Sequence, residues 1–449
     1  MDASAITSER QAPPQRRQIV SRILLGVLIF AAGSEFVVRG PIRFLNQSSD
    51  WNDLVPVYIP ARAWLHGQNP YDPNVYTAQV MDLFHKPWNP AAPRSHAVYP
   101  LSTFVWISPL AALPWGLAQP VWTLTLVALI AAMIISMIRA AGLESERAWI
   151  FAACTLALAP LHTGLATGNI SMAAAALAGL LFCEMHAGHK WAAGICLAAI
   201  VGLKPQIGLP LLIYYAFRSF WLPCGIATGG TLLSFAIGAL RLSRLGTVWT
   251  YDFFRNTRVF VGSNLFDDFS QRNPIRFTLI DLQVPFSYLV QDRTLTIVVA
   301  LAVTLTVAIL WLVLFRKERN HDDLLNISTI AILSLLPVYH RFYDASLLVL
   351  PLCWTICTHS TALAHLRRIC WVLMVPFLIP GASLLQQVSS EGLLARYVVN
   401  SWYWNFFVMP HETWALLALV VTLLRAMRRR IREQASLPEI PVFSREVAN

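Results

Sequence analysis

Charged residues are scarce in this chain of 449 residues. They make up 13% of the sequence, compared with roughly a quarter in a typical soluble domain, whereas hydrophobic residues make up 56% and the mean hydropathy is +0.54. So low a charge content excludes an ordinary soluble globular domain. We therefore expect an integral, multi-pass membrane protein.

Several sequence signatures are also missing. The chain has no HExxH motif, P-loop, nucleophile elbow or CxxC pair, which argues against a zinc protease, an ATPase and a serine hydrolase. None of the seven cysteines lies in a long polar loop, so no disulfide framework is indicated. Cys353 and Cys357 are spaced to share a helix face, and we interpret them as small apolar residues rather than metal ligands.

Acidic residues are fewer than basic ones, and the net charge is +10. In a nucleic-acid-binding protein the basic residues would follow one polar face or groove. Here they cluster between hydrophobic segments, as topology determinants do under the positive-inside rule. We therefore expect no nucleic-acid partner.

Long apolar segments dominate what is present. A spanning helix needs about 20 apolar residues, and we interpret twelve segments as spans: 19–38, 99–113, 119–138, 148–165, 170–185, 191–217, 222–240, 294–315, 324–339, 345–358, 369–385 and 413–427. The first lacks a small-residue cleavage site and is not a signal peptide. Breaks at 165–170 and at Lys204-Pro205 are compatible with re-entrant bends, which would change the count by one or two. The expected fold is an all-α bundle of about twelve transmembrane helices, with interfacial helices in the first outer loop.

Basic clusters set the expected orientation. They are Arg10, Arg16, Arg17 and Arg22, then Arg316, Lys317 and Arg319, then Arg367 and Arg368, and finally the run 425–432. With twelve spans all four clusters fall on one side, which the positive-inside rule makes cytoplasmic. The loops 39–98 and 246–293, the turn 340–344 and the segment 386–412 then share the opposite face, where we expect the active site. We expect a single transmembrane catalytic domain at 19–432 in a bacterial inner membrane, with disordered cytoplasmic tails at 1–18 and 433–449.

Two acids, Asp50 and Asp53, open the long aromatic loop after the first span. Because they are three residues apart, one helical turn would place them together near the bilayer boundary. Partial desolvation and a neighbouring like charge would raise the pKa of one of them and make it a candidate general base. The alternative is that either acid caps a short interfacial helix, the apolar face of which is formed by Trp51, Val55, Tyr58 and Trp64.

Cations in or beside the spans are further candidates. Lys204, in GLKPQIGLP, is flanked by apolar residues, so an anionic lipid phosphate is a plausible partner and snorkelling to the interface is the alternative. His340 and Arg341 follow a proline at the outer end of a span, close to Tyr343 and Asp344. An arginine fork suits a phosphate and a histidine suits a phosphate or a sugar hydroxyl. The alternative is an Arg–Asp pair at a helix corner.

The second long outer loop mixes amides and acids with aromatic residues. Its polar members are Asn264, Asp267, Asp268, Gln271, Arg272 and Asn273. This composition suits sugar hydroxyls and the apolar faces of sugar rings, although any solvated loop between spans can share it.

Motifs along the chain carry a resemblance to a known family. Asp53 is followed by Val57-Tyr58, Ala61, Ala63, Gly67 and Asn69-Pro70-Tyr71-Asp72, and later by Tyr99-Pro100, Pro109-Leu110-Ala111, Gly168-Asn169, Ala193-Gly194, Lys204-Pro205, Leu336-Pro337 and His340. Over about residues 20–350 this ordered set resembles glycosyltransferase family 87 of the GT-C superfamily, a group of polyprenyl-phosphate-sugar-dependent membrane α-mannosyltransferases. The chain differs from the family at Gly168-Asn169, where Gln commonly follows the Gly. It also differs at Tyr339-His340-Arg341, where a Trp and paired His are more usual.

The resemblance implies that Asp53 deprotonates an acceptor hydroxyl, that the sugar carbon is inverted and that polyprenyl phosphate leaves. Lys204, His340 and Arg341 are then candidate ligands of the donor phosphate. The candidate substrate-binding residues are Tyr58, Asn264 and Tyr343, and Asp50 is a second candidate catalytic acid.

The expected partners are a polyprenyl-phosphate-linked sugar, with mannose as the default, a glycan or glycolipid acceptor, and membrane lipid. No cofactor is expected. A metal is not clearly required, because Lys and Arg can supply positive charge, but the paired acids leave metal binding open. Two alternatives remain: a polytopic transporter or lipid flippase, which would more often carry charges on several spans, and a non-catalytic partner in surface-polymer assembly.

Overall fold

The computed structural model describes residues 15–47, 52–244, 246, 248–261 and 267–436. Within these ranges the protein is helical, and the extended pairing it shows is an isolated bridge between Leu279 and Arg341. The prediction of an all-α fold is therefore confirmed.

The helices, with short 3₁₀ or π turns written η, are in chain order α1 (Gln15–Val37), η1 (Val38–Ile42), α2 (Arg43–Asn46), α3 (Val55–Leu65), α4 (Pro73–Phe84), η3 (Pro93–Ser95), α5 (Leu101–Ala111), α6 (Trp115–Ala140), α7 (Ser145–Ala157), α8 (Ala159–Thr167), α9 (Ser171–His186), α10 (Lys190–Leu203), α11 (Pro205–Phe217), α12 (Trp221–Arg244), α13 (Trp249–Val261), η4 (Arg276–Thr278), α14 (Gln283–Leu289), α15 (Arg293–Lys317), α16 (Asp323–Leu333), η5 (Phe342–Leu348), α17 (Val349–Cys357), α18 (Ala364–Met374), η6 (Val375–Leu378), α19 (Gly381–Ser390), α20 (Arg396–Val399), η7 (Trp404–Val408) and α21 (His411–Ser436). Every apolar segment interpreted as a span overlaps one or more of these helices.

Helix length gives a lower span count than the apolar segments. Among the described residues, four helical stretches are long and apolar enough to cross a membrane: Ile19–Asn46, Trp115–Ala140, Trp221–Arg244 and Arg293–Lys317. Two bent pairs, α7 with α8 and α18–η6 with α19, raise the number to six if each pair is one span. Five further apolar helices are shorter. The count of about twelve spans therefore stays a prediction.

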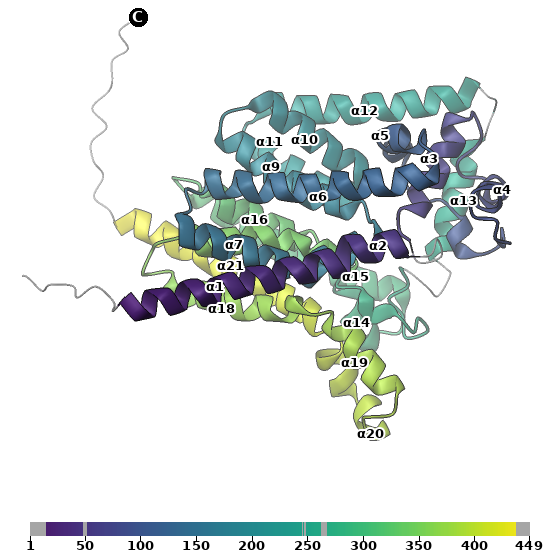
Figure 1. The fold of residues 1–449 in the computed structure, drawn as a ribbon. Helices are drawn as coiled ribbons and strands as arrows, with labels where there is room; N and C mark the ends of the chain where they lie inside the picture. Colours follow the sequence, from purple (N-terminus) through teal and green to yellow (C-terminus); the bar gives the residue numbers. More distant parts are fainter. Residues whose placement is uncertain (1–14, 48–51, 245, 247, 262–266, 437–449) are drawn as a thin grey trace, which may run out of the picture.

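The bundle has two distinct ends. Figure 1 shows the start of α1 and the end of α21 at one end, and α3, α4 and α13 at the other. Apolar side chains are exposed along its sides, such as Phe30 of α1 at 77% and Leu232 of α12 at 63%. An exposed apolar surface of this kind is expected where lipid replaces water.

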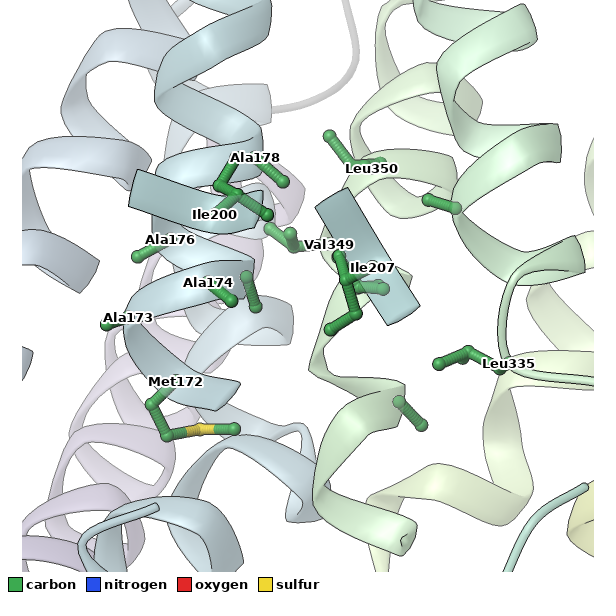
Figure 2. Packing of buried hydrophobic residues seen from close by; sticks show 14 of the residues in the cluster. Met172, Ala173, Ala174, Ala176, Ala178, Ile200, Ile207, Leu335, Val349 and Leu350 are labelled. Atoms are coloured by element: carbon green, nitrogen blue, oxygen red, sulfur yellow. The ribbon is translucent and has the colours of Figure 1, made fainter. Parts of the chain in front are cut away.

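Small residues allow close packing at the centre. The run from Ala173 to Ala176 on α9 is buried, and Figure 2 shows it beside Ile200 of α10 with Ile207 and Val349 nearby. On α11, a Cβ on Gly208 would lie 2.6 Å from the backbone of Val201. This glycine therefore lets α11 fold back closely on α10, which places Lys204 at the apex between them.

The predicted interfacial helix is not confirmed. A helix does form where it was expected, as α3, but it is buried on most of its surface. Val57, Ile59 and Ala61 lie outside the proposed apolar face and are themselves fully buried. Because apolar residues surround the helix, it packs inside the protein rather than lying one-sided on a membrane surface.

Candidate active site

A cavity of about 330 Å³ lies among segments that are distant in sequence. The first loop contributes residues from within 52–56 and 88–100, and single residues come from α4 and from the loop that joins α8 to α9. The α10–α11 junction, α13, Asp267 and the 339–343 turn complete the wall. The cavity thus brings together the two loops and the turn that the sequence predicts to share one face.

Asp53 enters this cavity from the segment just before α3. Its backbone N–H donates to the carbonyl of Thr167 at 2.7 Å. Its carboxylate Oδ2 accepts a hydrogen bond from Asn169 Nδ2 at 3.2 Å. The Leu54 N–H at the start of α3 is instead bound by Asn52 Oδ1 at 2.9 Å. Asn52 therefore closes a turn just ahead of α3, and the helix has no side-chain N-cap hydrogen bond, so the capping role that was the alternative for Asp53 is not observed.

Asn169 is held in place by the loop that joins α8 to α9. Its Oδ1 accepts hydrogen bonds from the backbone N and the Oγ of Ser171, at 2.9 and 2.6 Å. Gly168 ends α8 with φ +66°, and the ring of Phe44 lies 2.3 Å from where a Cβ would be. The carbonyl of Gly168 accepts from Trp122 Nε1 at 2.8 Å. These contacts fix Asn169 with its amide directed at the Asp53 carboxylate.

Lys204 lines the cavity but is already paired. Its Nζ lies 2.6 Å from Asp344 Oδ1 and 2.5 Å from Ser171 Oγ, and it stands over the ring of Tyr343. The residue is only 6% exposed, so snorkelling to an interface is not observed. A buried cation is tolerated when it is paired and hydrogen-bonded in this way. Among the described residues Asp344 therefore forms its ion pairs with Lys204 and His340, whereas the helix-corner alternative paired it with Arg341.

His340 lies behind the cavity wall. Its side chain is fully buried, and Nδ1 is 3.0 Å from Asp344 Oδ2. The same oxygen accepts the Arg341 backbone N–H at 3.0 Å. Within the described part of the chain His340 does not line the cavity, so its visible role is to orient Asp344.

Arg341 does line the cavity. The second long loop holds its backbone, because Leu279 bridges to Arg341 and the Ile280 N–H donates to the His340 carbonyl at 2.9 Å. Burial disfavours the charged form of Arg341, but the neighbouring Tyr339, Tyr343 and Asp53 raise its pKa, and the guanidinium stays charged. The cavity therefore contains a cation and the Asp53 carboxylate.

A second acid, Asp267, also lines the cavity. Burial raises its pKa to about 6, against the opposing effects of Arg293 and Arg341. Its Oδ1 has no hydrogen-bond partner among the described residues. In the same part of the chain, no group of three or more His, Cys, Asp or Glu side chains is arranged to hold a metal ion.

With this geometry in view, comparison with known proteins gives one decisive result. The family model of glycosyltransferase family 87 matches residues 97–351, more than half of the chain. The chain belongs to glycosyltransferase family 87. No curated protein and no solved structure matches it.

Membership of family 87 makes the chain a glycosyltransferase, which binds a sugar donor and an acceptor, and its apolar helices indicate a membrane protein. This supports the enzyme interpretation over the transporter. The matched range contains Lys204 and the 339–343 turn but begins after Asp53. From the sequence we expect the resemblance to begin at about residue 20, which would include Asp53. Because the family match begins later, the role of Asp53 depends on its position in the cavity.

The structure gathers only some of the candidate site residues of this family 87 member. Asp53, Lys204, Arg341 and Tyr343 line one cavity. Tyr58 does not: its hydroxyl donates to the Leu113 carbonyl at 2.7 Å inside the bundle. Asp50 and Asn264 lie outside the described residues.

Several cavity residues were not among the predicted site residues. They include Trp88, Arg94, His96, Tyr99, Asp267 and Tyr339. The composition of the stretch 86–99 could have indicated these residues. It combines basic, aromatic and proline residues between two apolar segments, and a simple connection between helices does not need them. For Asp267 no sequence signal separates it from the neighbouring Asp268.

Proposed function

We propose that this glycosyltransferase moves a sugar, mannose by default, from a polyprenyl-phosphate donor to a glycan or glycolipid acceptor, with inversion and with Asp53 as the general base. One observation carries the proposal: the Asp53 carboxylate and the Arg341 guanidinium line the same cavity. A displacement at a sugar carbon needs a proton acceptor on one side and a cation for the leaving phosphate on the other.

The chemical step follows from these two groups. The acceptor hydroxyl oxygen attacks the anomeric carbon of the donor, and its proton passes to the Asp53 carboxylate. The bond from that carbon to the phosphate oxygen breaks, and the electron pair leaves with polyprenyl phosphate. Arg341 stabilises the charge that develops on the phosphate. A single displacement from the opposite side inverts the sugar carbon.

The surrounding contacts assign supporting roles. Asn169 fixes the Asp53 carboxylate through its 3.2 Å hydrogen bond. Lys204 and His340, two candidate phosphate ligands, both bind Asp344, so we assign them to positioning the turn that carries Arg341. Tyr343, beneath the Lys204 ammonium, is retained as a substrate-contacting residue.

Apolar lining supports a lipid-linked donor. Val55, Pro56, Leu203, Phe260 and Val261 border the same cavity as the polar groups. A polyprenyl phosphate has apolar isoprene units next to its phosphate, and these can pack against the apolar wall. A nucleotide sugar has no comparable apolar surface beside its phosphates.

The expected setting extends this proposal. The cavity lies at the end of the molecule that carries α3, α4 and α13, away from the start of α1 and the end of α21 (Figure 1). If the basic clusters face the cytoplasm, the reaction takes place on the outer face of a bacterial inner membrane, in a bundle of about twelve spans.

The test uses the purified protein in lipid nanodiscs with radiolabelled polyprenyl-phosphate-mannose and a membrane extract as the source of acceptor. We expect Asp53→Asn to lower transfer by at least about 100-fold. The matched control is Asp82→Asn, an exposed acid on α4 in the same loop. Equal transfer by wild type and Asp53→Asn would reject the base, and no transfer by wild type would reject this donor.

A further inference from the structure

A second cleft, of about 670 Å³, lies at the other end of the molecule. Its wall contains four arginines from the last part of α21, Arg425, Arg428, Arg429 and Arg432, beside His365 and Leu366 at the start of α18. Figure 1 shows this end of α21 near the start of α1 and away from α3, α4 and α13. The cleft is therefore distinct from the Asp53 cavity.

The four arginines share one helix face. Their spacing of i, i+3, i+4 and i+7 places them on the same side of α21. Arg430 points elsewhere, since it contacts Asp322 and Glu318 at the ends of the neighbouring helices α15 and α16. One arginine of this run is thus used to join helices, and the others face the cleft.

Charge in the cleft is poorly compensated. Arg429 Nε lies 3.9 Å from Glu433 Oε1, in an ion pair with both side chains about half exposed. Arg425, Arg428 and Arg432 form no ion pair with any other described residue. Four guanidinium groups around one acid repel one another, and an anion between them removes that cost.

An apolar track leads away from the cleft along α18 and η6. His365, Arg368, Val372 and Val375 recur at helical spacing, Ile379 follows η6 in an extended conformation, and all five are exposed. The first two are polar, whereas Val372, Val375 and Ile379 are 68%, 57% and 50% exposed. A cationic cleft continuous with an exposed apolar strip matches a molecule with an anionic head and an apolar tail.

We propose that this cleft binds the phosphate headgroup of an anionic diacyl phospholipid, with the acyl chains along Val372, Val375 and Ile379. Arginine forks bind phosphate oxygens bidentately, and basic pockets between helices at the cytoplasmic side suit anionic lipid headgroups. The apolar track favours a lipid over free phosphate. The inference does not depend on the proposed donor or on Asp53.

The test measures lipid binding to the purified full-length protein in neutral detergent. Native mass spectrometry and the thermal unfolding midpoint are recorded with phosphatidylglycerol, phosphatidylcholine or inorganic phosphate. The variant is Arg425→Gln/Arg432→Gln. The control is Arg316→Gln/Lys317→Gln, which removes two exposed charges at the end of α15, a region joined to α21 by the hydrogen bonds of Gln434 to Arg319 and Asn320.

We expect wild type and the control to bind phosphatidylglycerol about tenfold more tightly than the arginine variant, a difference of about 1.4 kcal/mol. If the variant and the control lose phosphatidylglycerol binding equally, the effect comes from the total positive charge of the protein, and the proposed site is overturned. Equal stabilisation by inorganic phosphate and by lipid would overturn the lipid assignment. If the arginine variant does not fold, Val372→Ser/Val375→Ser tests the same site, and unchanged phosphatidylglycerol binding there would also overturn the proposal.

Discussion

Lys204 and Asp344 form a buried ion pair, with 2.6 Å between Nζ and Oδ1. The pair joins the α10–α11 junction to the turn that carries Arg341. The Ser171 hydroxyl accepts a hydrogen bond from Lys204 and donates one to the side chain of Asn169. The Asn169 amide in turn donates to the Asp53 carboxylate. A continuous set of hydrogen bonds thus connects the candidate base to the segment with the candidate phosphate ligand. The relative positions of base and cation therefore depend on this pair.

Removing one member of the pair is predicted to destabilise the protein. Lys204→Met leaves the Asp344 carboxylate buried without its cation, which costs about 3–5 kcal/mol. We expect a lower thermal unfolding midpoint in detergent, and partial recovery in Lys204→Met/Asp344→Leu, where neither charge remains. Lys190→Met, at the exposed start of α10, is the matched control. The same midpoint for Lys204→Met and Lys190→Met would show that the pair contributes no net stability.

Sequence reasoning located the helices and the breaks near the cavity well. Apolar length marks helices because unsatisfied backbone groups are costly in lipid. The breaks at Gly168-Asn169 and Lys204-Pro205 follow from local chemistry: Gly168 adopts φ +66°, and Pro205 cannot donate the backbone hydrogen bond that would continue α10. These breaks place two polar side chains at the cavity.

Side-chain partners were much harder to predict. Lys204 binds Asp344, which is 140 positions away in the chain, so only the packing of α9, α11 and η5 decides the pairing. Tyr58 was expected on a half-exposed helix, but tertiary burial covered α3 on most sides. Each difference arose where long-range packing outweighed local spacing.

Asn169 is predicted to act on catalysis through Asp53. Asn169→Ala removes the amide that fixes the carboxylate, and a small misplacement of a catalytic group costs up to about 100-fold in rate. We expect kcat to fall by about 10- to 100-fold with little change in the donor KM, in steady-state transfer assays. Asn74→Ala, with its exposed side chain on α4, is the control. A change in KM alone would assign Asn169 to substrate binding instead.

Asp267 is predicted to make donor binding depend on pH. Because burial raises its pKa to about 6, it is mostly neutral below that pH and negative above it. A negative Asp267 in the cavity repels the donor phosphate and competes for Arg341, so the donor KM should rise as the pH increases from 5 to 7. Asp267→Asn should remove this rise. A variant KM that retains the full pH dependence would point to another titrating group.

Gly168 is predicted to be indispensable for the site because two independent costs oppose a side chain there. Its φ of +66° costs an L-residue about 1–2 kcal/mol, and a Cβ would also meet the Phe44 ring at 2.3 Å. Gly142 has a similar φ of +58° but open space around it. Gly142→Ala should therefore lower the thermal unfolding midpoint only by the cost of its positive φ. Gly168→Ala should lower the midpoint further and also reduce transfer activity, because Asn169 follows directly.

The double variant Gly168→Ala/Phe44→Ala tests the cost of the clash between the new Cβ and the Phe44 ring, because a smaller side chain at position 44 makes room for that Cβ. If Gly142→Ala and Gly168→Ala lower stability equally, the Phe44 contact adds nothing, and the position of Asn169 does not depend on this close approach.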